Sequence, residues 1–467
     1  LVGSEMCIRD RILAQLALIV LCLLMFRVER KYKLAILLLS AICFNSVRIY
    51  AIPFGLSIYV LCFSFILSEF SRLKKDIKEV KNTILRPLMY SVILATVILA
   101  IHSPHYDNLT QYIRLAINEC IAKYFVLCYA FLSIRKEDDL RPVFRISYYG
   151  LLVLTLFALF NHVTKSAFFI NEMYRGMALT DVMQDAGNNY TYSERFRVQA
   201  MFFNPFDYGY ICILLLLFTW YGYIKSFISK KRFYMIIGCC LYGIIACGCR
   251  TNMLCCLIGV FVYVLFAFDL KKRTKYFAVC SLLGIILFSS IPFLQEKANE
   301  ILSIFDTNSS MSGSSIGMRV LQYTAVMNHV RDHFLLGRGL DYFLIDMGWR
   351  EGKQYLVDQD LFGLEGVLMN YLLERGFLGV CFYLFFYVYV LYFFYKHKSV
   401  DKNISALGIS ILVTYLAFAN MTGELNSVFP TLLITGICLK VLYMNIICKK
   451  IRNKHETVSY THLRAHE

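Results

Sequence analysis

Four arginines stand out as residues that could bind a phosphate-linked substrate. They are Arg197, Arg250, Arg319 and Arg338, and each lies at the end of an apolar run or in a long polar segment. The planar guanidinium group presents several N–H donors that match phosphate oxygens, and a set of them beside a membrane surface suits a lipid pyrophosphate. The alternative for Arg250 is a side chain that reaches the membrane surface or pairs with a carboxylate.

Acidic residues near the same segments could accept a proton from an attacking hydroxyl. Glu365 lies just before the apolar run 367–395, and a carboxylate in that position could act as a general base. The alternative is an ordinary glutamate at a helix start, where the helix dipole favours negative charge. Glu374, which is next to Arg375, and Glu424 are weaker candidates of the same kind.

Two further pairs have the i, i+4 spacing of helix neighbours. Glu119 and Lys123 make the expected helix 112–134 unusually polar, and this spacing predicts an internal ion pair, with a polar path through the membrane as the alternative. His329 and His333 could suit zinc, but position 330 is Val and no third ligand is evident. We therefore expect two solvated histidines, no metal site and no cofactor.

The composition indicates that these residues belong to a membrane protein. The 467 residues are 58% hydrophobic and only 17% charged, and the mean hydropathy is +0.57. Soluble domains are about 45–50% apolar and about 25% charged. The net charge of +16 is spread in short clusters between apolar runs, without a basic stripe that carries base-stacking aromatics. We therefore expect a lipid bilayer as a partner and no nucleic acid.

The apolar runs predict an all-α fold, a polytopic transmembrane helical bundle with about twelve to thirteen spans. A hydrocarbon core of about 30 Å needs about 20 residues per helix. The runs cover approximately 12–26, 34–47, 51–69, 87–101, 112–134, 146–162, 207–224, 233–248, 251–269, 276–293, 367–395, 404–421 and 429–447.

Every second connection between these runs is basic, which predicts the topology. Clusters such as Arg72–Arg86, Lys225–Arg232 and Lys396–Lys402 alternate with connections that are long or poor in Lys and Arg. Cytoplasmic loops carry the excess of Lys and Arg. This assigns the basic loops and the C-terminus to the cytoplasm, and it places the two long segments at about 163–206 and 294–366 outside.

The predicted organisation has five parts. Residues 1–11 and 458–467 resemble adapter-derived sequence and are expected to be non-native ends. Residues 12–293 form an N-terminal transmembrane region, residues 294–366 a large extracytoplasmic loop, and residues 367–457 a C-terminal transmembrane region. Within the large loop, Val320, Tyr323, Met327, Val330 and Phe334 repeat at helical spacing.

Four motifs resemble the bacterial O-antigen ligase/polymerase superfamily. They are RVQAMFFNPFDYGY at 197–210, CRTNML at 249–254, GMRVLQYTAVMNHVRDHFLLGRGLDYF at 317–343 and LERGFLG at 373–379. The resemblance implies an integral membrane glycosyltransferase, independent of metal, that acts on polyprenyl-pyrophosphate-linked oligosaccharides at the outer face of the bacterial cytoplasmic (inner) membrane. It implies that Arg250 and Arg319 hold the pyrophosphate, with Arg197 and Arg338 as helpers. A chain-length regulator or a flippase is the protein partner that fits this role.

One departure from the family pattern favours a polymerase of O-antigen, capsule or exopolysaccharide over a ligase. Ligases of the family carry a His at a fixed distance before Gly-x-x-Gly, and counting back from Gly376 and Gly379 gives Glu365 at that position. Glu365 is therefore the candidate catalytic residue. A ligase that moves finished glycan to a lipid or protein is the near alternative. A transporter or flippase of lipid-linked sugars is the alternative of another class, but its charges should lie at mid-membrane.

Overall fold

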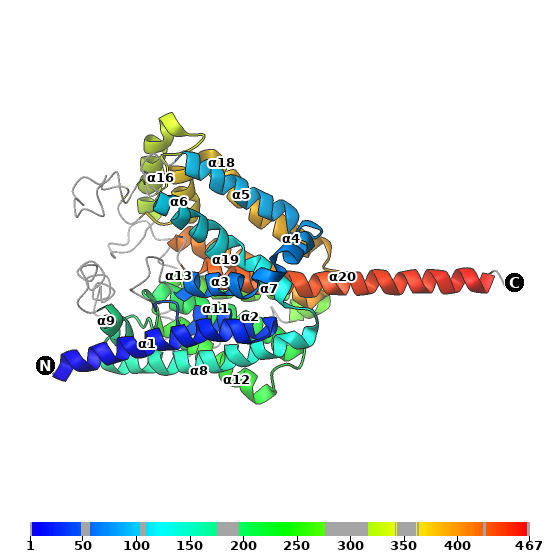
Figure 1. Cartoon of the computed structure of the whole chain (residues 1–467), viewed down its shortest axis with the longest axis horizontal. Helices are drawn as coiled ribbons and strands as arrows, with labels where there is room; N and C mark the ends of the chain where they lie inside the picture. The colour runs from blue at the N-terminus through cyan, green and yellow to red at the C-terminus, as the bar shows by residue number, and fades with distance from the viewer. Residues whose placement is uncertain are drawn as a thin grey trace.

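The molecule is a bundle of helices. The computed structural model describes residues 2–47, 57–102, 109–174, 196–275, 316–340, 342, 361, 364–423 and 426–464. Every regular element within these ranges is helical, which confirms the predicted all-α class. Most helices run side by side along the long direction of the molecule (Figure 1).

Six helices of the described ranges are long and apolar enough to cross a membrane. They are α8 (Arg141–Thr164), α11 (Pro205–Ile224), α13 (Arg250–Ala267), α18 (Val367–Lys396), α19 (Lys402–Thr422) and α20 (Val428–Arg464). Two bent pairs raise the number to eight: Phe70–Lys81 with α5 (Arg86–Ile101), and Leu109–Tyr124 with α7 (Val126–Ser133). The chain is therefore a multi-pass membrane protein.

The expected number of spans is only partly tested by these helices. Four of the remaining apolar runs lie in helices that are not among these candidates, namely α1 (Val2–Arg27), α2 (Arg30–Cys43), α3 (Ser57–Ser68) and α12 (Lys230–Ala246). The run at 276–293 lies outside the described residues. The count of about twelve to thirteen spans thus stays a prediction.

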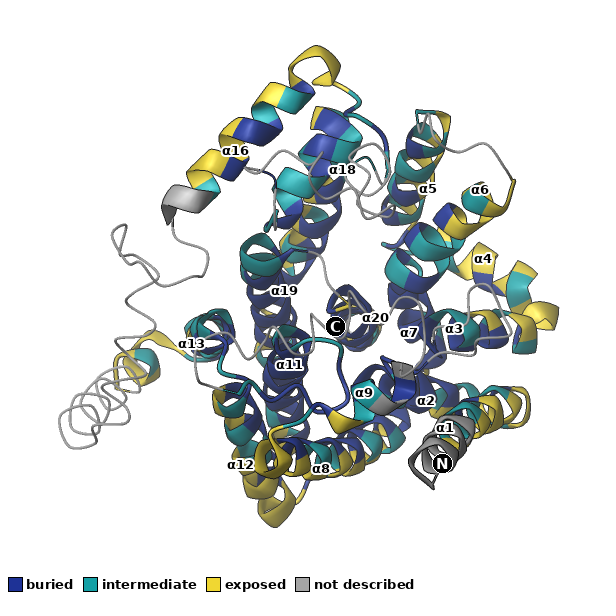
Figure 2. Ribbon diagram, turned by 90° about the vertical axis from the view of Figure 1, so that its left-hand side faces the viewer, coloured by how far each residue is buried: buried dark blue, intermediate teal, exposed yellow. Residues whose placement is uncertain are grey.

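The centre of the bundle is formed by α11 and α19. These helices bury 83% and 72% of their most apolar stretch, against 39% for α13 and 33% for α18, so they lie inside the protein and their neighbours face outwards (Figure 2). Close contact of α13 with α19 depends on Gly259, whose carbonyl accepts a hydrogen bond from Ser410 Oγ at 2.6 Å. A Cβ at Gly259 would lie 2.6 Å from Thr414 Oγ1. Small and hydroxyl-bearing residues commonly allow such approach between membrane helices.

The two ends of the bundle differ in charge, and we name them accordingly. The arginine face is the end at which α11, α13 and α18 begin and α19 ends, and Figure 2 looks onto it. The lysine face is the opposite end, where α18 ends at Lys396 and α19 begins at Lys402. The basic clusters that predicted the topology therefore gather at one end of the described helices.

A buried charge network supports the lysine face. Arg30 Nε donates to Glu69 Oε2 at 2.7 Å, and Arg30 Nη1 donates to Asp76 Oδ1 at 3.1 Å. Lys33 forms a second ion pair with Glu69. Burial would raise the pKa of Glu69, but the hydrogen bonds from Lys33 and Arg30 outweigh it and the pKa lies below its ordinary value. This network ties α2 to the segment after α3.

The helix α18 is broken near the arginine face, and the chain after α16 fills the break. Gly376 has φ 61° and ψ −166°, which only glycine adopts without strain. The loop after α16 (Ile316–Val330) and its 3-10 turn η5 (Arg331–His333) lies against this break, and four backbone hydrogen bonds join the two segments. These are Arg338 N to Leu373 O (2.8 Å), Gly339 N to Glu374 O (3.0 Å), Phe377 N to Phe334 O (2.8 Å) and Leu378 N to Leu335 O (3.2 Å).

The helix predicted within the large loop is confirmed as α16 and η5. Its buried residues Ala325, Val326 and Val330 pack with Leu361 and Leu373, so α16 rests on the first segment of α18. Most of the other residues of 294–366 lie outside the described ranges, and the division of the chain into five parts stays a prediction.

Candidate functional site

Arg319 and Glu365 meet at the arginine face, although 46 positions separate them in the sequence. Arg319 Nη2 donates to Glu365 Oε2 at 2.5 Å and to Met421 O at 2.6 Å, and Nη1 donates to Asn420 O at 3.4 Å. The side chains of Arg319 and Glu365 remain 24% and 32% exposed. We call this group the Arg319 centre.

The local sequence explains how the Arg319 centre forms. Glu365 precedes Gly366, which caps α18 with φ 103°, and a Cβ on Gly366 would lie 3.1 Å from Asn420 O. The absence of a side chain therefore brings the start of α18 close to the end of α19. Asn420 and Met421 are in the last turn of α19, where backbone carbonyls attract a cation. Arg319 thus joins three helices through one guanidinium group.

Arg197 and Arg250 lie together on another part of the arginine face. Arg250 is the first residue of α13 and follows Gly248, which has φ 63°. Val198 N donates to Ala246 O at 3.1 Å, so the segment with Arg197 runs beside this turn. A Cβ on Gly248 would lie 3.2 Å from Arg197 Cγ. Since α13 packs along the antiparallel α19, Arg250 begins a helix next to the one whose last carbonyls bind Arg319.

Arg338 has a different setting from the other predicted arginines. Its Nε donates to His329 O at 2.6 Å, and its guanidinium carbon lies 5.8 Å from the centre of the Tyr342 ring. His329 Nδ1 is 3.3 Å from the Tyr342 hydroxyl. Within the described ranges, His329 does not belong to any group of three or more residues that could hold a metal ion. The contacts of Arg338 stabilise the loop that fills the break in α18.

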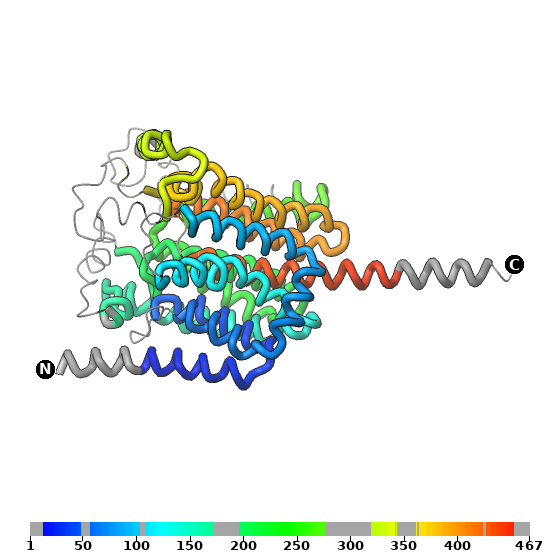
Figure 3. Tube along the Cα trace, turned by 45° about the horizontal axis from the view of Figure 1, so that its top comes forward, coloured from blue at the N-terminus to red at the C-terminus, as the bar shows by residue number. Residues whose placement is uncertain are grey.

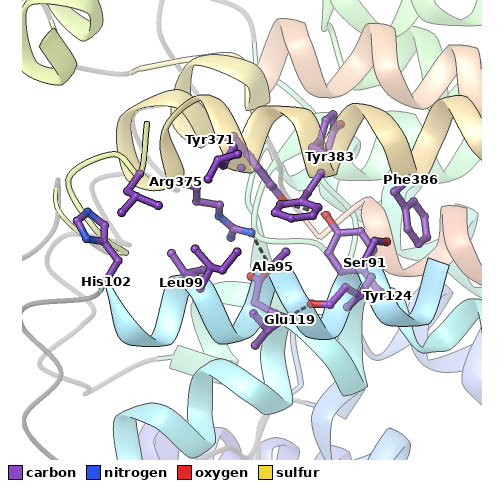
Figure 4. Close-up of a pocket in the computed structure, with 17 residues that line it drawn as sticks. Ser91, Ala95, Leu99, His102, Glu119, Tyr124, Tyr371, Arg375, Tyr383 and Phe386 are labelled. Carbon is purple, nitrogen blue, oxygen red and sulfur yellow. Dashed lines mark hydrogen bonds and ion pairs between the residues drawn. The ribbon is translucent and has the colours of Figure 1, made fainter. Parts of the chain in front are cut away.

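Sequence reasoning missed Arg375 as a site residue. The predicted ion pair of Glu119 with Lys123 is confirmed at 3.4 Å, and Arg375 Nη1 joins it by donating to Glu119 Oε2 at 2.9 Å (Figure 4). The Arg375 guanidinium also lies over the Tyr371 ring, 4.1 Å from its centre. The signal is the charged pair in LERGFLG, in which Arg375 follows Glu374. We call this group the Arg375 centre.

Asp207 is a second residue that sequence reasoning missed. It lies in the first turn of α11 and is only 3% exposed. Its backbone N–H donates to Asn204 Oδ1 at 2.8 Å, and its Oδ2 accepts from Asn204 Nδ2 at 3.0 Å. The signal was an acid in FNPFD at the start of an otherwise apolar helix. Of the weaker candidates, Glu374 accepts a hydrogen bond from Gly339 N through its backbone carbonyl, and Glu424 lies outside the described residues.

The helices are long and apolar enough to cross a membrane, and arginines lie together at one end of the bundle. The molecule is therefore a polytopic membrane protein with a polar site at that end. Residues 233–384 match the model of a family described as O-antigen ligase. The match supports the resemblance of this segment to the O-antigen ligase/polymerase superfamily. It includes Arg250, Arg319, Arg338 and Glu365. No curated protein matches the chain.

Proposed function

We propose that the chain is a polymerase of surface polysaccharide that transfers glycan between polyprenyl-pyrophosphate-linked repeat units. The observation that carries the proposal is the Arg319 centre, in which a cationic fork and a carboxylate lie together, partly exposed, within the segment that matches the family. One group is suited to a pyrophosphate and the other to a sugar hydroxyl. No other described site at the arginine face combines a partly exposed guanidinium group with a partly exposed carboxylate.

Each of these residues has a role in the proposed transfer. The acceptor hydroxyl attacks the anomeric carbon of the donor glycan, and its proton passes to the Glu365 carboxylate. The bond between that carbon and the pyrophosphate oxygen breaks, and the polyprenyl pyrophosphate leaves with the electron pair. Arg319 and Arg250 stabilise the negative charge that develops on the leaving group, because donors that are already in place need not reorganise during the reaction. Arg197 supports Arg250, and Arg338 shapes the loop beside α18.

The choice of polymerase over ligase rests on Glu365, which stands where ligases of the family are expected to carry His. A ligase is the second candidate, because the family match covers both activities. A flippase is less well supported, since the Arg319 centre lies at the end of α19 rather than halfway along the helices. The arginine face would be the outer face of the bacterial cytoplasmic membrane, with the C-terminus in the cytoplasm, and the lysine face would follow the positive-inside rule.

Substitution of the two leading arginines tests the proposal. Arg250→Ala and Arg319→Ala should each leave single repeat units in place of long chains, while the protein still reaches the membrane. Lys at either position keeps the charge but loses the fork, so it should restore chain length only in part. Arg331, an exposed arginine of η5, supplies the control: Arg331→Ala should give chains of normal length. Normal chains in both leading variants at normal protein levels would contradict the proposal.

The same glycan profile separates the alternatives. Without a polymerase, single repeats reach the final acceptor. Without a ligase, long chains stay on the polyprenyl carrier, and without a flippase, repeat units stay on the cytoplasmic side. Gel separation of glycans from a strain in which this gene is deleted, together with the lipid-linked fraction, distinguishes the three.

A further inference from the structure

A groove runs between α5 and α18, beside the Arg375 centre. In Figures 1 and 3 the two helices lie side by side, and the groove between them is partly open to the surroundings. Its walls are mainly apolar or aromatic, including Val92, Ala95, Leu99, Phe382 and Phe386. This lining is typical of a site for an apolar ligand that carries a few polar groups.

The groove is long and narrow because it follows both helices. Its α5 wall extends from Ser91 to His102, and its α18 wall extends from Tyr371 to Phe386. At a rise of about 1.5 Å per residue, the unbroken part of the α18 wall from Leu378 to Phe386 spans roughly 12 Å. The outward side of α5 is also apolar, with Leu94 and Val97 about half exposed, as expected of a helix that faces lipid. This shape fits a linear hydrocarbon chain.

The polar end of the groove is formed by the Arg375 centre. Arg375 and Lys123 both pair with Glu119. Arg375 Nε is buried and makes no hydrogen bond within the described part of the chain. Gly379 makes room for this arrangement, since a Cβ there would collide with the Arg375 side chain. The Arg375 centre can therefore complement one anionic group.

The charges lie at the level expected of lipid headgroups. A span of about 20 residues counted back from Lys396 begins near Gly376. The Arg375 centre is thus at the end of the hydrocarbon layer, and the apolar part of the groove lies within it. Arginine at this boundary is a common partner of lipid phosphate.

We propose that the groove holds the isoprenoid chain of the second lipid-linked substrate and that the Arg375 centre holds its phosphate. This inference rests on the proposed function, because only a polymerase uses two polyprenyl-linked substrates at once. The donor loses its pyrophosphate at the Arg319 centre, whereas the acceptor keeps its own at the Arg375 centre. Arg375 lies nine positions after Gly366, or about 13 Å along α18, a distance that a short oligosaccharide can bridge.

Native mass spectrometry of the purified full chain tests the proposal, with undecaprenyl phosphate as the probe. The wild type should bind two molecules. Ala95→Phe, which fills the groove, should bind one, and the affinity of the lost site should fall at least tenfold. Val97→Phe on the lipid-facing side of the same helix is the matched control and should bind two. The double variant Glu119→Gln/Arg375→Gln should also lose one molecule.

The outcomes separate this inference from the proposed function. Two molecules bound to Ala95→Phe, or equal competition by phosphatidylglycerol, would overturn the groove proposal. If Ala95→Phe loses one molecule while the double variant Arg250→Gln/Arg319→Gln still binds two, the groove proposal stands and the pyrophosphate role of those arginines fails. Undecaprenol, which lacks the phosphate, should bind the groove at least tenfold more weakly, and equal binding would remove the role of Arg375.

Discussion

The Arg319 and Arg375 centres are both arginine–glutamate pairs, but their surroundings differ. The Arg319 centre is 24–32% exposed and borders the carbonyl end of α19. The Arg375 centre is 4–13% exposed, and both Arg375 and Lys123 pair with its carboxylate. A partly exposed pair can exchange its partner for substrate at small cost, whereas a buried pair is expensive to break. From this comparison we assign the proton transfer to the Arg319 centre, and the binding and positioning of substrate to the Arg375 centre.

The largest effect should come from the glycine that links the two centres. Gly376→Ala forces φ 61° on a residue with a side chain, and its Cβ would collide with the backbone of Gly337. We expect little or no folded protein in the membrane, measured by detergent-resistant fluorescence of a tagged chain. Gly238→Ala is the matched control, because a Cβ there meets no atom within 4 Å. Normal levels of Gly376→Ala would show that the break in α18 does not support either centre.

The next largest effect should be a loss of stability when the buried pair of Arg375 and Glu119 is broken. Arg375→Gln removes the closer of the two cations that pair with Glu119, at 2.9 Å against 3.4 Å for Lys123, and a hydrogen bond to a charged group contributes about 1.5–3 kcal/mol. Glu119→Gln/Arg375→Gln should lose less stability than the sum of the two single variants, because each single variant already removes the interaction between the two side chains. Thermal unfolding in detergent of both variants and of Glu119→Gln gives the coupling between the two side chains. Strictly additive effects would mean that the pair contributes no interaction energy.

The Arg319 centre should respond much less in the same stability experiment. Glu365→Gln removes a partly exposed ion pair, so the free energy of unfolding should change by at most about 1 kcal/mol. A loss as large as that of Arg375→Gln would place both pairs in one structural class and would remove the basis for assigning chemistry to Glu365.

The smallest effect should be a pH dependence at the lysine face, where no substrate is proposed. The pKa of Glu69 is lower in the folded protein than its ordinary value, so its ion pairs contribute stability above that value. This contribution should be lost as the pH falls below about 4.5 and through the lowered pKa. Thermal unfolding of the wild type and of Glu69→Gln between pH 3 and pH 7 measures it. Parallel profiles would show that Glu69 does not contribute.

The sequence predicted the helical class and the ion pair of Glu119 with Lys123, because apolar runs and i, i+4 spacing are local signals. It also selected Arg319 and Glu365, although nothing local shows that they touch. Their contact depends on Gly366 and on the position of the last turn of α19, which are properties of the packed bundle. Arg375 was missed for the same reason, since its partner Glu119 lies 256 positions away.

The break in α18 could not be predicted either. Within an apolar run, Gly376 is typical of a glycine inside a helix. Its backbone angles and the four hydrogen bonds between α18 and the 334–339 loop show that the helix is interrupted there. The conformation of Gly376 is therefore determined by a segment that precedes it by about 40 positions. At this position tertiary contacts override the local helix propensity of the sequence.

The central claim is that Glu365 accepts the proton of the acceptor hydroxyl, and the glycan length of a Glu365→Gln strain tests it most directly. The gene would be replaced at its own locus, with protein levels matched to the wild type and Arg331→Ala as the control. Loss of a general base lowers a rate by about 10²- to 10⁴-fold, so the variant should carry almost exclusively single repeat units. A wild-type length distribution in Glu365→Gln would contradict the account.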